Sequence, residues 1–95
     1  MPWRRKMLID LETLESEVCA FGCRLPPQAL RELAGLCEES YCAGLLCAPP
    51  PASVAAAATA HILAGRLAEW SAVRVICDSF HATGLADRES TMAGT

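Results

Sequence analysis

Residues 8–41 read LIDLETLESEVCAFGCRLPPQALRELAGLCEESY, and this stretch predicts two amphipathic helices joined by a short turn. In the first helix, Asp10 is placed as the N-cap, and Glu12 lies in the first turn, where the helix dipole stabilises a negative charge. The apolar residues recur every three or four positions and therefore share one face. That face consists of Leu11, Leu14, Val18 and Phe21. Gly22 tolerates a left-handed backbone, so we expect this helix to span about residues 10–22.

The second helix is expected over about residues 27–46. Pro26 and Pro27 mark its start, because proline is tolerated in the first turn of a helix. Its apolar face consists of Leu30, Leu33, Ala34, Cys37 and Tyr41. Short connections usually place two helices side by side. We therefore expect the two helices to form a hairpin that is the stability centre of the fold, with Phe21 buried as the wedge between them.

A third helix is predicted after a proline-rich break at residues 48–52, since consecutive prolines cannot continue a helix. Ser53 is the expected N-cap, and helical spacing of apolar residues continues over about residues 53–81. The alternative for residues 72–77 is a short strand, but no second strand is available to pair with it. Gly84 is expected to end the ordered part of the chain.

The sequence therefore predicts an all-α fold: a small three-helix bundle, with a four-helix bundle as the alternative. The single helical domain is expected over residues 8–84. Residues 1–7 are expected to form a flexible basic arm and residues 85–95 a disordered tail. A chain of 95 residues is long enough for one domain.

Charge and hydropathy limit the classes of partner. The net charge is −3, which argues against binding to a phosphate backbone, so we expect no direct nucleic-acid contact. Residues 40–65 carry no formal charge, but Pro49–Pro51 interrupt them and leave too short an apolar run to cross a membrane. Asp10 and Glu12 follow the basic residues too closely for a secretory signal. We expect no membrane contact and an intracellular location, in the nucleus or the cytoplasm.

The six cysteines are the most conspicuous feature of the composition. A disulfide framework is one hypothesis, but the spacing of Cys19 and Cys23 does not match that of Cys37 and Cys47, so two bridges would not align. A zinc site is another, and Cys19 and Cys23 with Cys77 and His81 are the available ligands, although no Cys-x-x-Cys pair is present. The favoured interpretation is reduced cysteines that pack as small apolar residues, with no metal and no cofactor.

The sequence offers no catalytic constellation. His61 lies in an alanine-rich segment, and Ser53, Ser71 and Ser79 lack the context of a nucleophile. No glycine-rich phosphate loop is present. We therefore expect no catalytic residues and no enzyme activity.

The hairpin resembles the N-terminal helical domain of the B (second) subunit of eukaryotic DNA polymerases alpha and epsilon. The residues that carry the resemblance are Leu14, Phe21-Gly22, Leu30, Leu33 and Leu36-Cys37. It covers about residues 11–41, and the segment after Tyr41 departs from the family pattern. The resemblance implies a small helical docking domain that tethers other replication proteins within a larger complex.

The function expected from the sequence is a protein-interaction module that presents a helix face to a protein partner. The residues expected to bind the partner are Leu63, Leu67, Trp70 and Val73, because tryptophan and large aliphatic residues often anchor interfaces. Trp70 is also a candidate core residue, since the chain has few aromatic residues to fill its interior. The alternatives are a small cysteine-dependent helical protein, using redox chemistry or zinc, and a subunit that folds on assembly.

Overall fold

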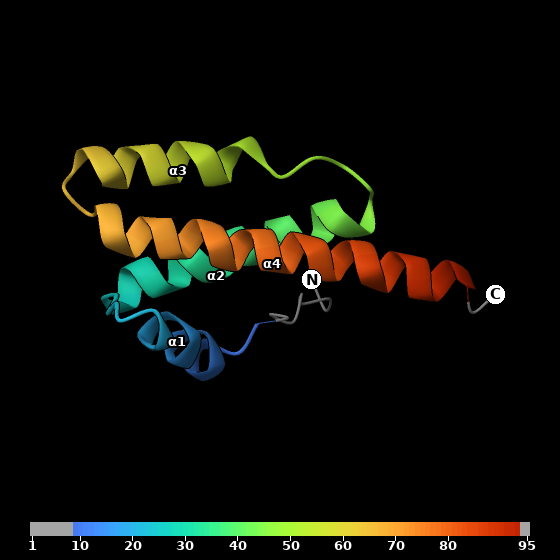
Figure 1. Ribbon diagram of the computed structural model, residues 1–95, viewed down its shortest axis with the longest axis horizontal. Helices are drawn as coiled ribbons and strands as arrows, with labels where there is room; N and C mark the ends of the chain where they lie inside the picture. The colour runs from blue at the N-terminus through green and yellow to red at the C-terminus, as the bar shows by residue number, and fades with distance from the viewer. Residues whose placement is uncertain (1–8, 94–95) are drawn as a thin grey trace, which may run out of the picture.

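A computed structural model of the chain describes residues 9–93. These residues form four helices and no strand: α1 (Leu11–Ala20), α2 (Pro27–Leu45), α3 (Ala52–Leu63) and α4 (Leu67–Ala93) (Figure 1). The all-α prediction is therefore confirmed, and the strand alternative for residues 72–77 is wrong. The predicted basic arm, residues 1–7, lies outside the described residues.

Three of the four helices end in the same hydrogen-bonded turn, the Schellman motif. In each, the residue three positions past the last helical residue donates its N–H to a carbonyl five positions back: Cys23 to Val18, Ala48 to Ala43 and Arg66 to His61. The residue before each donor adopts a positive φ, at Gly22 (78°), Cys47 (55°) and Gly65 (89°). Gly22 ends α1 as predicted. The prediction of one helix over residues 53–81 is wrong, because the turn at Gly65 divides this part of the chain into α3 and α4.

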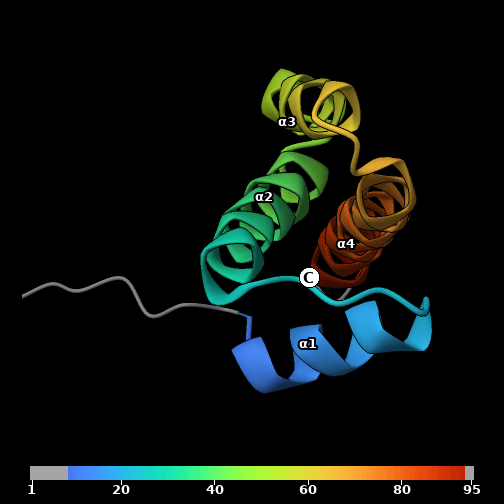
Figure 2. The ribbon, with the colours of Figure 1, turned by 90° about the vertical axis from the view of Figure 1, so that its left-hand side faces the viewer.

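The core is built around α2 and α4, which run in the same direction side by side (Figures 1 and 2). Their inward-facing residues recur at spacings of three and four, and each position on α4 is forty residues after its counterpart on α2. We call these positions the α2–α4 seam: Leu30, Leu33, Cys37, Ser40 and Gly44 on α2, and Trp70, Val73, Cys77, Phe80 and Gly84 on α4. All are buried except Phe80, which is half-buried. Most contacts between helices in the described chain join these two.

The α2–α4 seam is closest at Gly44 and Gly84, where the two backbones touch. A Cβ atom on Gly84 would lie 2.2 Å from the carbonyl oxygen of Tyr41, and one on Gly44 would lie 2.2 Å from that of His81. Glycine is therefore required at both positions. Gly84 lies within α4 and does not end the ordered chain, so that prediction is wrong.

Polar contacts extend the α2–α4 pairing beyond Gly84. The Tyr41 hydroxyl donates to Asp87 Oδ2 at 2.6 Å, and Arg88 Nη1 donates to the carbonyl of Leu45 at 2.9 Å. The second bond satisfies a carbonyl in the last turn of α2 that has no partner within the helix. The disordered tail predicted over residues 85–95 is therefore wrong for residues 85–93, which continue α4.

Helix α1 lies across one side of the α2–α4 pair (Figure 2). Leu14 and Val18 enter the core as predicted. Phe21 does not: its side chain is 50% exposed, and the wedge prediction is wrong. Phe21 is the C-cap of α1, where the backbone leaves the helix and its side chain leaves the apolar face. The stability centre predicted in the α1–α2 hairpin lies instead in the α2–α4 seam.

Helix α3 covers the opposite side of the pair from α1 (Figure 2). It buries only Val54 and Ala58. The prediction that Ser53 is the N-cap is wrong, because Pro51 takes that position. The Ser53 hydroxyl instead donates a hydrogen bond to the Glu39 carboxylate on α2. Pro51 suits the N-cap because its φ is fixed at a value that the extended backbone before a helix also has. The two prolines before it, Pro49 and Pro50, cannot extend the helix backwards.

Candidate protein-interaction surface

The structure divides the four residues predicted to bind a partner into two pairs. Leu63, at the end of α3, is 83% exposed, and Leu67, at the start of α4, is 61% exposed. Trp70 and Val73 have no exposed surface and belong to the α2–α4 seam. Only Leu63 and Leu67 are thus accessible to a partner in the folded chain.

Trp70 is held in the core by stacking. The His61 ring of α3 lies parallel to its indole at 3.8 Å between ring centroids, with an interplanar angle of 3°. His61 Nε2 is in turn 3.3 Å from Glu32 Oε2 on α2. The indole Nε1 is buried and has no hydrogen-bond partner among the described residues. These contacts join α2, α3 and α4 around one aromatic side chain and leave His61 committed to a structural role.

The surface of α3 that faces away from the core carries no charge. We call it the α3 outer face, and its exposed residues are Ala52, Ala55, Ala56, Thr59, Ala60 and Leu63. Residues 52–65 include no aspartate, glutamate, lysine or arginine. Exposed helix faces of soluble domains normally carry charged residues. The α3 outer face is therefore a flat, uncharged surface with one large apolar side chain, Leu63, at its end.

Two of the six cysteines meet inside the α2–α4 seam. The thiols of Cys37 and Cys77 are buried at the same level of the seam and interact with each other. This interaction, with burial, raises the pKa of Cys37 well above its usual range; the same interaction lowers the pKa of Cys77. Cys19 and Cys47 are exposed, and Cys23 and Cys42 are half-buried.

The zinc ligand set considered from the sequence is not assembled. Cys77 is buried in the seam, whereas Cys19 is exposed on α1. His81 is engaged elsewhere, with its Nε2 2.8 Å from the carbonyl oxygen of Ala48. Within residues 9–93, no three potential ligands from histidine, cysteine, aspartate and glutamate come together.

A surface that the sequence analysis missed runs along α4, first beside α1 and then beside α2. Three cavities adjoin one another there and share lining residues. The first, beside Phe21 and Val75, shares Glu17 with the second. The second shares Ile9 and Phe80 with the third, which also contains Tyr41. We call their union the α1–α4 groove. Phe21 and Val75, each about half exposed, border its first cavity. The sequence predicted that Phe21 is buried between the first two helices. Because of that wrong prediction, its exposed ring was not considered as part of a surface groove.

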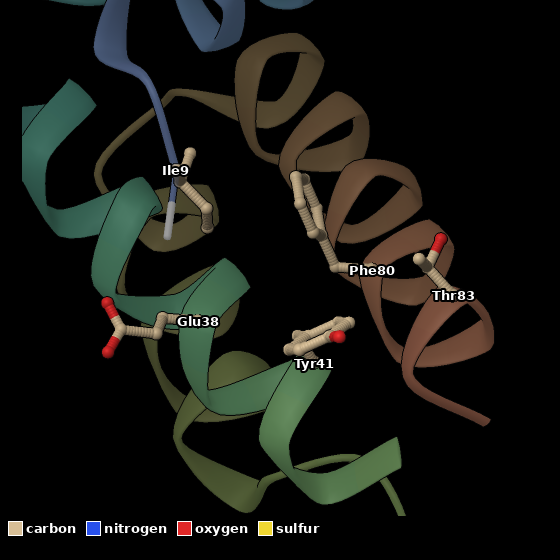
Figure 3. A pocket seen from close by; sticks show the side chains of 5 residues that line it. All are labelled: Ile9, Glu38, Tyr41, Phe80 and Thr83. Carbon is tan, nitrogen blue, oxygen red and sulfur yellow. The ribbon is translucent and has the colours of Figure 1, made fainter. Parts of the chain in front are cut away.

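The third cavity of the α1–α4 groove is open to solvent and is lined mainly by three large side chains. Ile9, Tyr41 and Phe80 surround a common space between α2 and α4, and the Glu38 carboxylate points away from it (Figure 3). Thr83 completes the lining, and the cavity volume is about 190 Å³. This volume is below the 300–1,000 Å³ typical of small-molecule sites and suits one large side chain.

No helix in the described part of the chain is both long and apolar enough to cross a membrane. Comparison with protein-family models, with curated proteins and with solved structures finds no match to this chain.

Proposed function

We propose that the chain is a non-catalytic protein-interaction module that binds an apolar helix of a protein partner through the α3 outer face. The observation that carries the proposal is the exposure of Leu63, 83%, at the end of a helix face without charge. Exposed apolar patches of this kind mark interaction sites in soluble proteins. The resemblance of residues 11–41 to a polymerase B-subunit domain supports the same class of function, a docking domain within a larger complex.

The side chains of the α3 outer face suit contact with another helix. Alanine at positions 52, 55, 56 and 60 leaves the backbone accessible to close approach. Alanine also loses no side-chain entropy when it is covered. Leu63 and the nearby Leu67 would supply most of the apolar area that the partner buries. Because α3 buries only two residues against its own domain, a partner helix would complete a layer that the chain leaves open on one side.

The proposal predicts that Leu63→Glu weakens partner binding. We expect a loss of about 2 kcal/mol or more, roughly thirtyfold in affinity, because the charge would be buried at an interface anchor. The partner would first be captured in cells by a photo-crosslinking amino acid at position 63, and its affinity then measured by calorimetry. The melting temperature should not change, since Leu63 contributes little to the core.

Leu46 provides the matched control. It is 72% exposed but lies at the end of α2, outside the α3 outer face. A crosslinker at position 46 should not capture the same protein, and Leu46→Glu should retain the wild-type affinity. Equal capture from both positions, or equal loss in both variants, would contradict the proposal.

The second candidate function is cysteine-dependent, and the contact between Cys37 and Cys77 is the observation that favours it. Hydrogen peroxide would take two electrons from the two thiols, giving one disulfide and two molecules of water. The two residues occupy the same level of a parallel helix pair whose backbones touch about two turns further on, which favours the short separation that a disulfide needs. The lowered pKa of Cys77 favours the thiolate that reacts.

This candidate predicts that peroxide joins Cys37 to Cys77 in the folded protein. We expect a loss of two hydrogen atoms in the intact mass, a cross-linked peptide containing both residues, and a higher melting temperature. The variant Cys37→Ala should not form the cross-link, whereas Cys19→Ser, at an exposed position, should form it normally. Oxidation confined to Cys19, Cys23, Cys42 and Cys47 would exclude this function.

A further inference from the structure

The α3 outer face is symmetric about the middle of its helix. Its six positions form three pairs, and the two members of each pair are equally far from the midpoint of α3, which lies between residues 57 and 58. The pairs are 52 with 63, 55 with 60, and 56 with 59. An antiparallel copy of α3 therefore presents the same set of positions at the same levels. A face with this property can pack against itself around a two-fold axis, which is the symmetry of most homodimers.

The side chains at these paired positions are complementary in size. In the antiparallel arrangement, Leu63 of one copy lies level with Ala52 of the other, and Thr59 lies level with Ala56. The largest side chain of the face thus meets one of the smallest, as interdigitating layers require. The two edges of the face carry only alanine, at positions 55 and 60, so neither edge holds the helices apart. Antiparallel packing also places the positive end of each helix dipole beside the negative end of the other.

The charges beside the two ends of α3 are complementary as well. At its start, Ser53 donates a hydrogen bond to the exposed Glu39 of α2. Just past its end lies the exposed Arg66, which lines a cavity together with the first turn of α2 and is thus on the same flank as Glu39. Two-fold symmetry keeps the α2 flanks of both copies together, so it brings Arg66 of each copy toward Glu39 of the other. Glu32 also lies on this flank, but its carboxylate is 3.3 Å from His61 of its own copy.

We propose that the α3 outer face binds a second copy of this chain, with the two α3 helices antiparallel in a two-fold symmetric dimer. The inference rests on the proposed function, because it names the partner of the same surface. The match in size and charge favours a second copy over an unrelated apolar helix, for which the face offers only its lack of charge. A helix of 12 residues is about 18 Å long, so the interface is smaller than the roughly 800 Å² per partner of standard complexes. We therefore expect weak, reversible association, with a Kd of the order of 0.1 mM.

Sedimentation equilibrium of the purified full chain tests for the dimer. We expect the apparent mass to rise from 10.1 kDa toward twice that value as the protein concentration passes through the Kd. Leu63→Glu should stay monomeric at the same concentrations, whereas Leu46→Glu should associate like the wild type. A reducing agent keeps the exposed thiols of Cys19 and Cys47 from joining copies covalently.

Two charge reversals test the antiparallel arrangement. Glu39→Arg and Arg66→Glu each place like charges at both end contacts, so each variant alone should associate several-fold more weakly than the wild type. An equimolar mixture pairs arginine with glutamate at both contacts and should recover the wild-type association. Glu12→Arg makes the same change in charge as Glu39→Arg at an exposed position of α1, on the opposite side of the molecule from α3, and should associate like the wild type (Figure 2). Circular dichroism would establish that all the variants keep the wild-type fold.

Three results would overturn this dimer. The first is a wild-type chain that stays monomeric at millimolar concentration. The second is association that Leu63→Glu leaves unchanged, which would place the contact on another face. The third is a mixture of the two charge reversals that associates no better than either variant alone. If the chain stays monomeric but a crosslinker at position 63 captures a different protein, the dimer is wrong and the proposed function stands. If the chain stays monomeric and position 63 captures nothing, both are wrong.

Discussion

Replacing Gly84 with alanine is expected to destabilise the protein by about 3 kcal/mol, a cost at the upper end of that for overpacked cores. The new Cβ would lie 2.2 Å from the Tyr41 carbonyl oxygen, 3.0 Å from Gly44 Cα and 3.0 Å from the Leu45 nitrogen. All three are backbone atoms, so no side-chain rotation relieves the clash. The α2 and α4 backbones must separate, and the contacts of Tyr41 with Asp87 and of Arg88 with Leu45 would be strained with them.

Urea denaturation followed by circular dichroism measures this effect, and Gly35→Ala is its matched control. Gly35 also lies within a long helix, but a Cβ there meets nothing within 4 Å. Alanine at position 35 is therefore expected to stabilise the protein by about 0.5–1 kcal/mol, through its higher helix propensity. If the two variants had the same stability, the close contact of α2 with α4 would be wrong.

The second large effect is expected from Trp70→Ala, which should cost about 3–5 kcal/mol. Trp70 is the largest fully buried side chain in the described chain, and its indole stacks on His61. Removing it leaves a cavity at the level of Leu30 and takes away the surface against which the end of α3 packs. The free energy of unfolding of a domain is of the order of 5–15 kcal/mol, so the variant would lose a large part of it.

Phe21→Ala is the control for Trp70→Ala, because it removes an aromatic ring of similar character from a half-exposed position. Most surface substitutions change stability by about 0.5 kcal/mol or less, and half of the Phe21 surface is already in water. The two midpoints in thermal unfolding should therefore differ widely. A larger loss for Phe21→Ala would restore the hairpin as the stability centre and contradict the α2–α4 seam.

Local periodicity was sufficient to predict the inward faces of α1 and α2. Leu14, Val18, Leu30, Leu33 and Cys37 are buried as their spacing requires. The same periodicity failed at Phe21, because it assumes that the helix continues through each position it counts. The backbone of Phe21 has already left the helix, and the side chain follows the backbone.

Glycine illustrates why the remaining structure was not predictable from local sequence. Gly65 ends a helix with a left-handed backbone, whereas Gly84 lies inside a helix and allows another backbone to approach. Nothing adjacent to either glycine distinguishes these two roles. The distinction depends on α2, which is forty residues from α4 in the chain and meets it only in the folded molecule.

The predicted interaction site was affected by the same turn. Leu63, Leu67, Trp70 and Val73 share one face only if the helix is continuous. The turn at Gly65 places Leu63 on α3 and the other three on α4, where Trp70 and Val73 enter the core. The exposure of Leu63 and Leu67 could not be read from spacing alone.

The forty-residue offset between α2 and α4 also has a consequence for synthesis on the ribosome. At about 5–20 residues per second, the part of α4 that pairs with a given residue of α2 is made roughly 2–8 s later. During that interval the inward face of α2, including Leu30 and Leu33, has no α4 to cover it. α1 covers only part of that face, and α3 emerges first but makes most of its contacts with α4. The nascent chain therefore passes through a stage of several seconds in which an apolar helix face is exposed to solvent, the condition under which unfinished chains aggregate or bind chaperones.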